Sequence, residues 1–227
     1  MTNVEKEIYV NLIKNGLAMI DEKVKNRDEG LYELPYGSIY LLNNRIPLFL
    51  DKTVLTSMIL ESISYGFGKD AVLEVIDEVT KRGIIPMACP YEGEFIGYKK
   101  GKDKENDNVI VTLRIPAHAK RSSAWGNKCR CSEAIVEDIR KIERYTDESC
   151  KDVYENIFRY KSRIIQSTSK QIKSARTIFR YGSCKKPLRY LLGQTVKPDS
   201  FDPNRFNECS NGIHFFMTEQ EALDYVI

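Results

Sequence analysis

The sequence contains no long apolar run, and this absence limits the classes of protein that it can encode. A transmembrane helix needs about 18 consecutive apolar residues. Hydrophobic residues make up 42% of the 227 residues, but charged residues, at 30%, interrupt them throughout. The first ten residues, MTNVEKEIYV, carry early acids and no apolar signal core. We therefore expect a cytoplasmic protein with no membrane partner.

Cysteine and histidine are scarce, with six and two residues respectively. Cys129 and Cys131 are the only close pair of cysteines, whereas a structural zinc site usually shows two such pairs or a pair with suitably spaced histidines. A cytosolic chain of this size rarely needs disulfides. We therefore predict small buried thiols, no metal and no cofactor.

Catalytic motifs are also absent. The sequence has no Gly-rich P-loop, no GxSxG elbow, no HExxH pair and no convincing combination of cysteine with histidine. These absences favour a binding protein over an enzyme.

Acidic residues are missing from two stretches, 109–132 and 156–198, and the second of these holds eleven lysines and arginines in 43 residues. Residues 1–108 carry 14 lysines and arginines against 18 acids, whereas residues 109–227 carry 21 against 14. A charge run is usually a solvated face. Charge of one sign over this length repels itself, so the second half is expected to meet an anionic partner.

Hydrophobic periodicity predicts an α+β protein. A mainly helical N-terminal part, residues 1–85, is expected to pack on a small, mainly antiparallel sheet domain, residues 86–227, crossed by one long basic helix. The expected helices are 3–26, 53–64, 71–81, 148–178 and 219–225, the last capped by Thr218. The expected strands are 38–42, 46–50, 84–89, 94–99, 109–114, 134–136 and 213–217, with 95–99 and 109–114 forming a hairpin.

The candidate site is the basic loop after strand 109–114, together with the second acid-free stretch. Guanidinium, ammonium and hydroxyl groups are good phosphate ligands, and a tryptophan can stack on a base, although a single tryptophan is equally typical of a core. His118, within the loop, could also contact phosphate. The predicted ligand-binding residues are Lys120, Arg121, Ser122, Ser123, Trp125, Lys128, Arg130, Arg176, Arg180 and His214.

The second half also contains a set of distinctive short phrases. They are FIGYK at 95–99, IPAHAKRSSA at 115–124, KCRC at 128–131 and CSNGIHFF at 209–216, followed by Glu221, Ala222 and Tyr225. Together they resemble a domain of unknown function that accompanies pentapeptide repeats and also occurs alone in phage and other viral proteins. The resemblance covers roughly residues 90–227 and implies no established activity. The repeats themselves are absent from this chain.

One of these phrases has a second likeness. The segment Gly212–Phe216, followed by Ala222 and Tyr225, resembles the nicotinamide-pocket segment of the ADP-ribosyltransferase fold. Most members of that fold place a catalytic glutamate on a later strand, whereas Glu133 and Glu137 precede the segment here. The aromatic residues of the segment are equally typical of a core.

These observations leave three readings of function. We favour a non-enzymatic binding protein for a phosphate-bearing ligand, either a nucleotide signal or a nucleic acid, and occurrence of the domain in phages extends this to a role in countering host defence. The second reading is a divergent transferase or hydrolase acting on NAD or another nucleotide, using His214 with Glu133 or Glu137. The third is an interaction module that binds a host protein through the acidic helical half.

Overall fold

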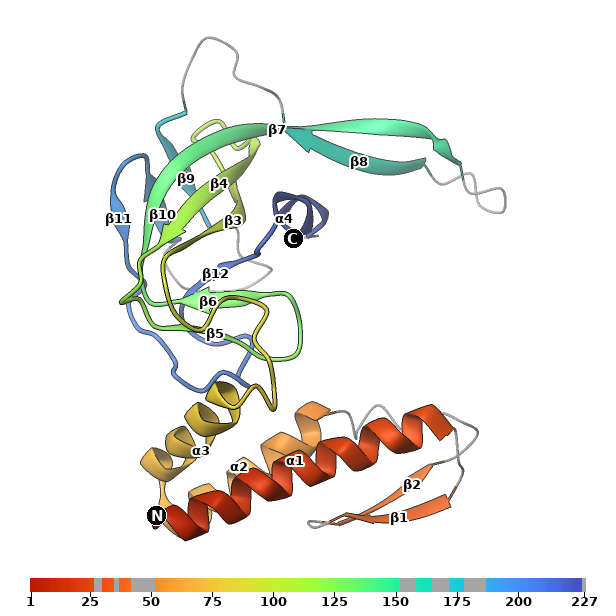
Figure 1. Ribbon diagram of the computed structural model, residues 1–227. Coiled ribbons are helices and arrows are strands. Elements are labelled where there is room, and N and C mark those ends of the chain that lie inside the picture. The colour runs from red at the N-terminus through yellow and green to blue at the C-terminus, as the bar shows by residue number, and fades with distance from the viewer. Residues whose placement is uncertain are drawn as a thin grey trace. The chain divides into compact units, whose positions relative to one another are not determined.

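The computed structural model describes residues 1–26, 30–34, 37–41, 52–151, 158–164, 172–177 and 187–225 (Figure 1). The chain divides into two compact units. The first unit comprises Met1–Met87 with Pro203–Glu208, and the second comprises Ala88–Asp202 with Cys209–Ile227. Helices in the first unit and antiparallel sheets in the second confirm the α+β class.

The first unit is built on three helices, α1 (Asn3–Asn26), α2 (Lys52–Phe67) and α3 (Lys69–Lys81). They match the predicted helices because apolar residues at helical spacing, such as Ile13, Ile59 and Val75, are fully buried. A short antiparallel hairpin joins β1 (Gly30–Leu34) and β2 (Gly37–Leu41). The predicted strand 46–50 lies outside the described residues. No helix in the described ranges is long and apolar enough to cross a membrane.

The predicted strand 84–89 is wrong, because this segment consists of bends and irregular backbone. Pro86 interrupts it and has no N–H for a strand ladder. The carbonyls of Ile85 and Pro86 are instead bound by Arg205, which is 2% exposed and donates to them at 2.6 and 2.9 Å. The same guanidinium donates to the Thr80 hydroxyl at 2.9 Å. Arg205 therefore ties the segment 203–208 to the first unit.

The second unit contains a seven-stranded antiparallel sheet whose strand order is β10-β9-β3-β4-β7-β11, with β8 paired to β7. The two end strands of this order, β10 and β11, contact each other and are joined by a turn that contains Gly193 at φ 76°. The sheet therefore curls round to bring its ends together (Figure 1). The strands are β3 (Phe95–Lys102), β4 (Asn108–Ile115), β7 (Ala134–Lys151), β8 (Phe158–Ile164), β9 (Ser174–Arg176), β10 (Arg189–Leu191) and β11 (Thr195–Val196).

The inner face of the curled sheet holds the core of this unit. Val109, Val111 and Leu113 alternate on β4 and are fully buried there. The predicted hairpin is confirmed, since β3 pairs with β4 from Phe95 opposite Ile115 to Lys102 opposite Asn108.

The outer face of the sheet is covered in part by α4 (Glu219–Asp224). Ile110 packs there against Ala222 and Leu223. Thr218 caps this helix in the predicted capping box with Glu221. At the other end of the helix, the ammonium of Lys100 donates to the carbonyl of Leu223 at 2.6 Å.

A second, three-stranded sheet has the order β12-β6-β5, formed by β12 (Ile213–Phe215), β6 (Cys129–Cys131) and β5 (Arg121–Ser123). It is joined to the large sheet just after β12, where Tyr98 and Phe216 exchange two backbone hydrogen bonds of 2.8 Å. Beside this bridge, the ring of Phe215 packs on Gly97. The two sheets therefore form one unit through β12.

The predicted long basic helix at 148–178 is wrong. β7 continues past the predicted 134–136 to Lys151, and β8 and β9 occupy 158–164 and 174–176. β7 leaves the large sheet paired with β8 as a two-stranded ribbon (Figure 1). The segment is rich in tyrosine, isoleucine, threonine and phenylalanine, which favour strands, and non-local pairing outweighed the helical spacing of its apolar residues.

The close packing of Phe215 on Gly97 gives a prediction about stability. A Cβ atom on residue 97 would lie 2.5 Å from the Phe215 ring carbon Cδ2. We expect Gly97→Ala to lower the free energy of unfolding of the second unit by about 1–3 kcal/mol, the usual range for overpacking. Urea unfolding followed by fluorescence of Trp125, the only tryptophan, measures this unit.

The control is Gly66→Ala in α2, where an added Cβ would meet no atom within 4 Å. Alanine is the better helix former, so this variant should unfold at the same urea concentration or higher when helix circular dichroism is monitored. An unchanged midpoint for Gly97→Ala would contradict the packing of β12 on β3.

Candidate anion-binding surfaces

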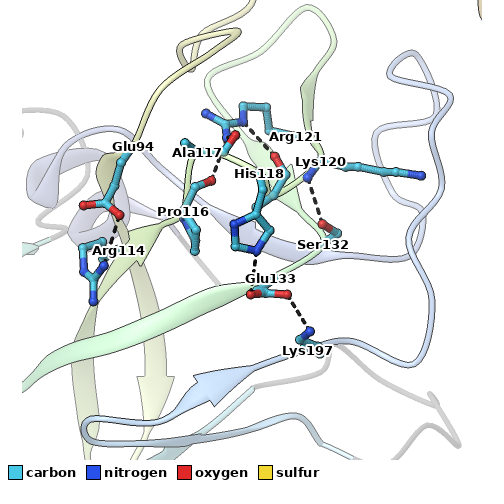
Figure 2. Close-up of polar contacts among 11 residues, drawn as sticks. Glu94, Arg114, Pro116, Ala117, His118, Lys120, Arg121, Ser132, Glu133 and Lys197 are labelled. Carbon is cyan, nitrogen blue, oxygen red and sulfur yellow. Dashed lines mark hydrogen bonds and ion pairs between the residues drawn. The ribbon is translucent and has the colours of Figure 1, made fainter.

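Arg121, in the predicted basic loop, organises the fold of that loop (Figure 2). Its guanidinium lies over the ring of Phe95, 5.1 Å from the ring centroid. It donates hydrogen bonds of 2.5–3.0 Å to four backbone carbonyls, those of Gly93, Pro116, Ala117 and Ala119. Arg121 therefore holds the loop in shape, and four of its five N–H donors are already occupied.

Three other predicted residues lie in one row across the small sheet. The register places Ser122 opposite Arg130, and Arg130 opposite His214. Arg130 is 1% exposed, stacks over Phe201 and donates to backbone carbonyls of the loop that follows β11. The structure thus brings together three residues that are up to 92 positions apart in sequence, with Ser122 and Arg130 buried and His214 half-buried. Ser122 is 2% exposed and its hydroxyl has no hydrogen-bond partner among the described residues.

The candidate catalytic carboxylates have partners other than His214, and Figure 2 shows those of Glu133. Glu133 accepts from Lys197 at 2.7 Å and contacts the His118 ring nitrogen Nε2 at 3.0 Å. Lys197, and to a smaller extent His118, hold the pKa of Glu133 below its usual range. Glu137 is paired with Arg114 at 2.5 Å. Each candidate carboxylate is thus already paired with a basic side chain.

The remaining predicted residues of the loop differ in accessibility. Lys120 is exposed and its backbone N–H donates to the Ser132 hydroxyl at 2.9 Å. Ser123 is buried and its hydroxyl accepts from the Ala88 N–H at 2.7 Å. Trp125 is half-buried. Arg180 lies outside the described residues.

Lys128, which is half-buried, lies beside a lysine that sequence analysis did not select. Its ammonium is 5.7 Å from the centroid of the Tyr225 ring. The neighbouring lysine is Lys99 on β3, whose ammonium donates to the His214 carbonyl at 3.0 Å. Burial and then the charge of Lys128 lower the pKa of Lys99 to about 8. The two ammonium groups are therefore close enough to repel each other.

A row of three cations crosses the outer face of the large sheet. In the antiparallel register, Lys102 on β3 lies opposite Arg176 on β9, and Arg176 lies opposite Arg189 on β10. Direct cross-strand partners share a face, so the three side chains are neighbours. Arg176 and Arg189 are exposed, and Lys102 is half-buried. We refer to these three residues as the cation row.

The groups around the cation row leave it with a surplus of positive charge. Arg176 donates to the amide oxygen of Asn106, a neutral group, at 2.8 Å. The charge of Lys102 contributes to lowering the pKa of Asp107, but the main partner of Asp107 is Lys141, at 2.8 Å. Lys102 was not selected from the sequence because it stands in a turn rich in acids. Only the strand register shows that it continues the row of Arg176 and Arg189.

One group of side chains in the described residues has an arrangement suited to a metal ion. The carboxylates of Asp103, Glu105 and Asp107 lie within 4.8 Å of one another. Lys141 pairs with both Glu105 and Asp107, so this group already has a cation. Cys129 and Cys131, considered for zinc, are free buried thiols on β6.

Comparison with known proteins identifies the family of the chain. The model of a family of unknown function, DUF5758, matches residues 85–175 and 159–222. These matches span more than half of the chain, which therefore belongs to this family. The searches of curated proteins and of solved structures found no match.

The contacts of Arg121 predict that it stabilises the second unit. We expect Arg121→Met to lower the free energy of unfolding by about 2–3 kcal/mol. Hydrogen bonds from charged donors contribute about 1.5–3 kcal/mol each, but the carbonyls of Gly93 and Ala117 are exposed and regain hydrogen bonds to water, so the loss is well below the sum over four bonds. Urea unfolding followed by Trp125 fluorescence provides the measurement. Arg114→Met is the control, since its partners are the exposed carboxylates of Glu94 and Glu137, and its loss should be much smaller. Equal losses in the two variants would contradict a structural role for Arg121.

Proposed function

We propose that this member of the DUF5758 family is a non-enzymatic binding protein for a phosphate-bearing ligand, and that the cation row is its main contact surface. The observation that carries the proposal is the register, which places Lys102, Arg176 and Arg189 side by side on three adjacent strands.

Repulsion within the cation row favours an anionic partner. Neighbouring strands are about 4.8 Å apart, and two unit charges at that distance repel by about 1 kcal/mol even in water. Like charges directly opposite each other on a sheet are destabilising for this reason. An anion bound among the three cations would be attracted to each of them and would offset their mutual repulsion. The arrangement therefore favours binding of an anion.

The shape of the surface favours a nucleic acid over a free nucleotide. Small-ligand sites are concave and mostly apolar, whereas Arg176 and Arg189 are exposed on the face of a sheet. Polyanion binding depends on neutralising successive phosphates and needs no enclosed pocket. We therefore propose a single-stranded nucleic acid as the ligand. The binding experiment below would also detect a nucleotide signal, if that is the ligand instead.

The wider biological role is an extension of this proposal. The resemblance of the sequence to a domain that occurs in phage proteins supports a role in countering host defence, through sequestering an anionic signal or occupying a nucleic acid. This extension and the link to pentapeptide repeats rest on the resemblance alone.

The salt dependence of binding tests the proposal. Fluorescence anisotropy of a labelled single-stranded oligonucleotide gives the binding constant at several salt concentrations. Each neutralised phosphate contributes about −0.7 to the slope of log K against log salt for a single strand. The double variant Arg176→Gln/Arg189→Gln should therefore reduce the magnitude of the slope by about 1.4 and weaken binding at low salt.

Arg114→Gln is the matched control, because this arginine is also on the surface of the second unit but is paired with two carboxylates. Its slope should equal that of the wild type. An unchanged slope in the double variant would overturn the assignment of the cation row. Salt-resistant binding of a mononucleotide would show that the ligand is a small nucleotide and not a nucleic acid.

A further inference from the structure

We propose that His118 is a phosphoryl-acceptor residue, which takes a phosphoryl group from a phosphoramidate onto its ring nitrogen Nδ1, and that Glu133 is the residue that positions the ring. The pair shares no residue with the cation row. The proposal therefore does not depend on the proposed nucleic-acid function.

The contact between Glu133 and His118 determines which ring nitrogen is the nucleophile. The carboxylate oxygen Oε1 of Glu133 lies 3.0 Å from Nε2 of His118 (Figure 2). An ionised carboxylate can only accept a hydrogen bond, so Nε2 carries the hydrogen. In the neutral ring the other nitrogen then holds the free lone pair. Nδ1 is therefore the atom of this ring that can attack phosphorus.

Lys197 holds the carboxylate of Glu133 in its ionised form and in place. Its ammonium lies 2.7 Å from Oε2, the oxygen that does not face the ring. Lys197 is the largest cause of the lowered pKa of Glu133, and the hydrogen bond to His118 acts in the same direction. The carboxylate is therefore bound on both sides, by an ammonium and by the imidazole N–H (Figure 2).

The backbone fixes the histidine and the glutamate relative to each other. The N–H of Ala119 donates to the carbonyl of Pro116 at 3.0 Å, which closes a four-residue turn with the histidine at its third position. The next residue, Lys120, is tied to Ser132 by two hydrogen bonds of 2.9 Å, one from each backbone N–H. Ser132 directly precedes the glutamate, so the pair stands on two segments that are bonded side by side.

The nucleophilic nitrogen is open to a donor. The His118 side chain is 73% exposed, and its only polar contact among the described residues is the one from Nε2 to Glu133. Residues 109–132 contain no acid, and the charge of Glu133 is balanced by Lys197. An anionic donor can therefore approach Nδ1 from solvent, and transfer to this exposed nitrogen needs no enclosed pocket.

The transfer balances without an oxidant or a reductant. The lone pair of Nδ1 attacks phosphorus and a new N–P bond forms. The P–N bond of the donor breaks, and its electron pair leaves with the protonated nitrogen as a neutral amine, or as ammonia from phosphoramidate itself. The ring then carries a positive charge, because Nε2 keeps its hydrogen, and this charge faces the Glu133 carboxylate. A phosphohistidine on another protein is itself a phosphoramidate and belongs to the same class of donor.

Chemical phosphorylation of the folded chain tests the proposal. The protein is incubated with potassium phosphoramidate and mapped by peptide mass spectrometry without acid, because phosphohistidine is acid-labile. His118 should carry several times more phosphate than His214, which is half-buried on β12. Proton–phosphorus NMR then identifies the nitrogen that carries the phosphate. The same incubation in urea gives the isomer ratio of a histidine without a fixed partner.

The isomer ratio reports the positioning by Glu133. Nδ1 lies beside Cβ and is the more hindered nitrogen, so phosphate on a free histidine collects on Nε2 during a long incubation. In the folded protein the ratio should shift towards Nδ1 by roughly 2- to 10-fold, the effect of one hydrogen bond to a charged group that is partly screened by solvent. A ratio equal to that in urea, or equal labelling of His118 and His214, would overturn the proposal.

Two glutamate variants separate positioning from folding. The amide of Glu133→Gln can donate or accept, so it no longer selects one tautomer, and the isomer ratio should return to the value in urea while Trp125 fluorescence shows a folded unit. Glu137→Gln is the matched control, because Glu137 is paired with Arg114 instead, and its ratio should equal that of the wild type. An unchanged ratio in Glu133→Gln would remove Glu133 as the positioning residue.

Discussion

The backbone bridge between Tyr98 and Phe216 is the interaction on which the second unit depends. Its two hydrogen bonds join the three-stranded sheet to the large curled sheet. Two side-chain contacts accompany it, the Phe215 ring on Gly97 and the Lys99 ammonium on the His214 carbonyl. One short segment, residues 213–216, therefore sets the junction of the sheets and the position of the Lys99 ammonium. Loss of the bridge would separate Lys99 from the carbonyl that orients it.

Strand β3 places lysines in two different environments, because successive residues of a strand point to opposite faces. On its inner side Lys99 is half-buried beside Lys128, and burial reduces its charge. On its outer side Lys102 begins the cation row, where Arg176 and Arg189 are exposed. Gly101 separates the two lysines and allows β9 to approach, since a Cβ there would lie 3.1 Å from the Arg176 carbonyl. The same strand thus presents a weakly charged amine on one face and fixed cations on the other.

The sequence was sufficient for the elements that local patterns determine and insufficient for those that depend on distant pairing. The helices α1–α3, the β3–β4 hairpin and the Thr218 capping box follow from spacing and capping. The three-residue strands β5 and β6 are too short to leave a periodic signal, whereas β12 lies within the predicted strand 213–217. The basic helix expected at 148–178 failed because pairing of Ile142 with Ile164 stabilises strands instead. Arg121 and Arg130 were selected by charge, but charge does not show that backbone carbonyls already occupy their donors.

We propose that the anionic ligand lies on the cation row rather than on the basic loop, and one measurement separates the two surfaces. Backbone amide shifts would be followed by NMR while a short single-stranded oligonucleotide is added to the full chain. The account predicts that the largest shifts fall in β9, β10 and the end of β3 around Lys102. Shifts concentrated in residues 116–133, or no shifts at low salt, would contradict it.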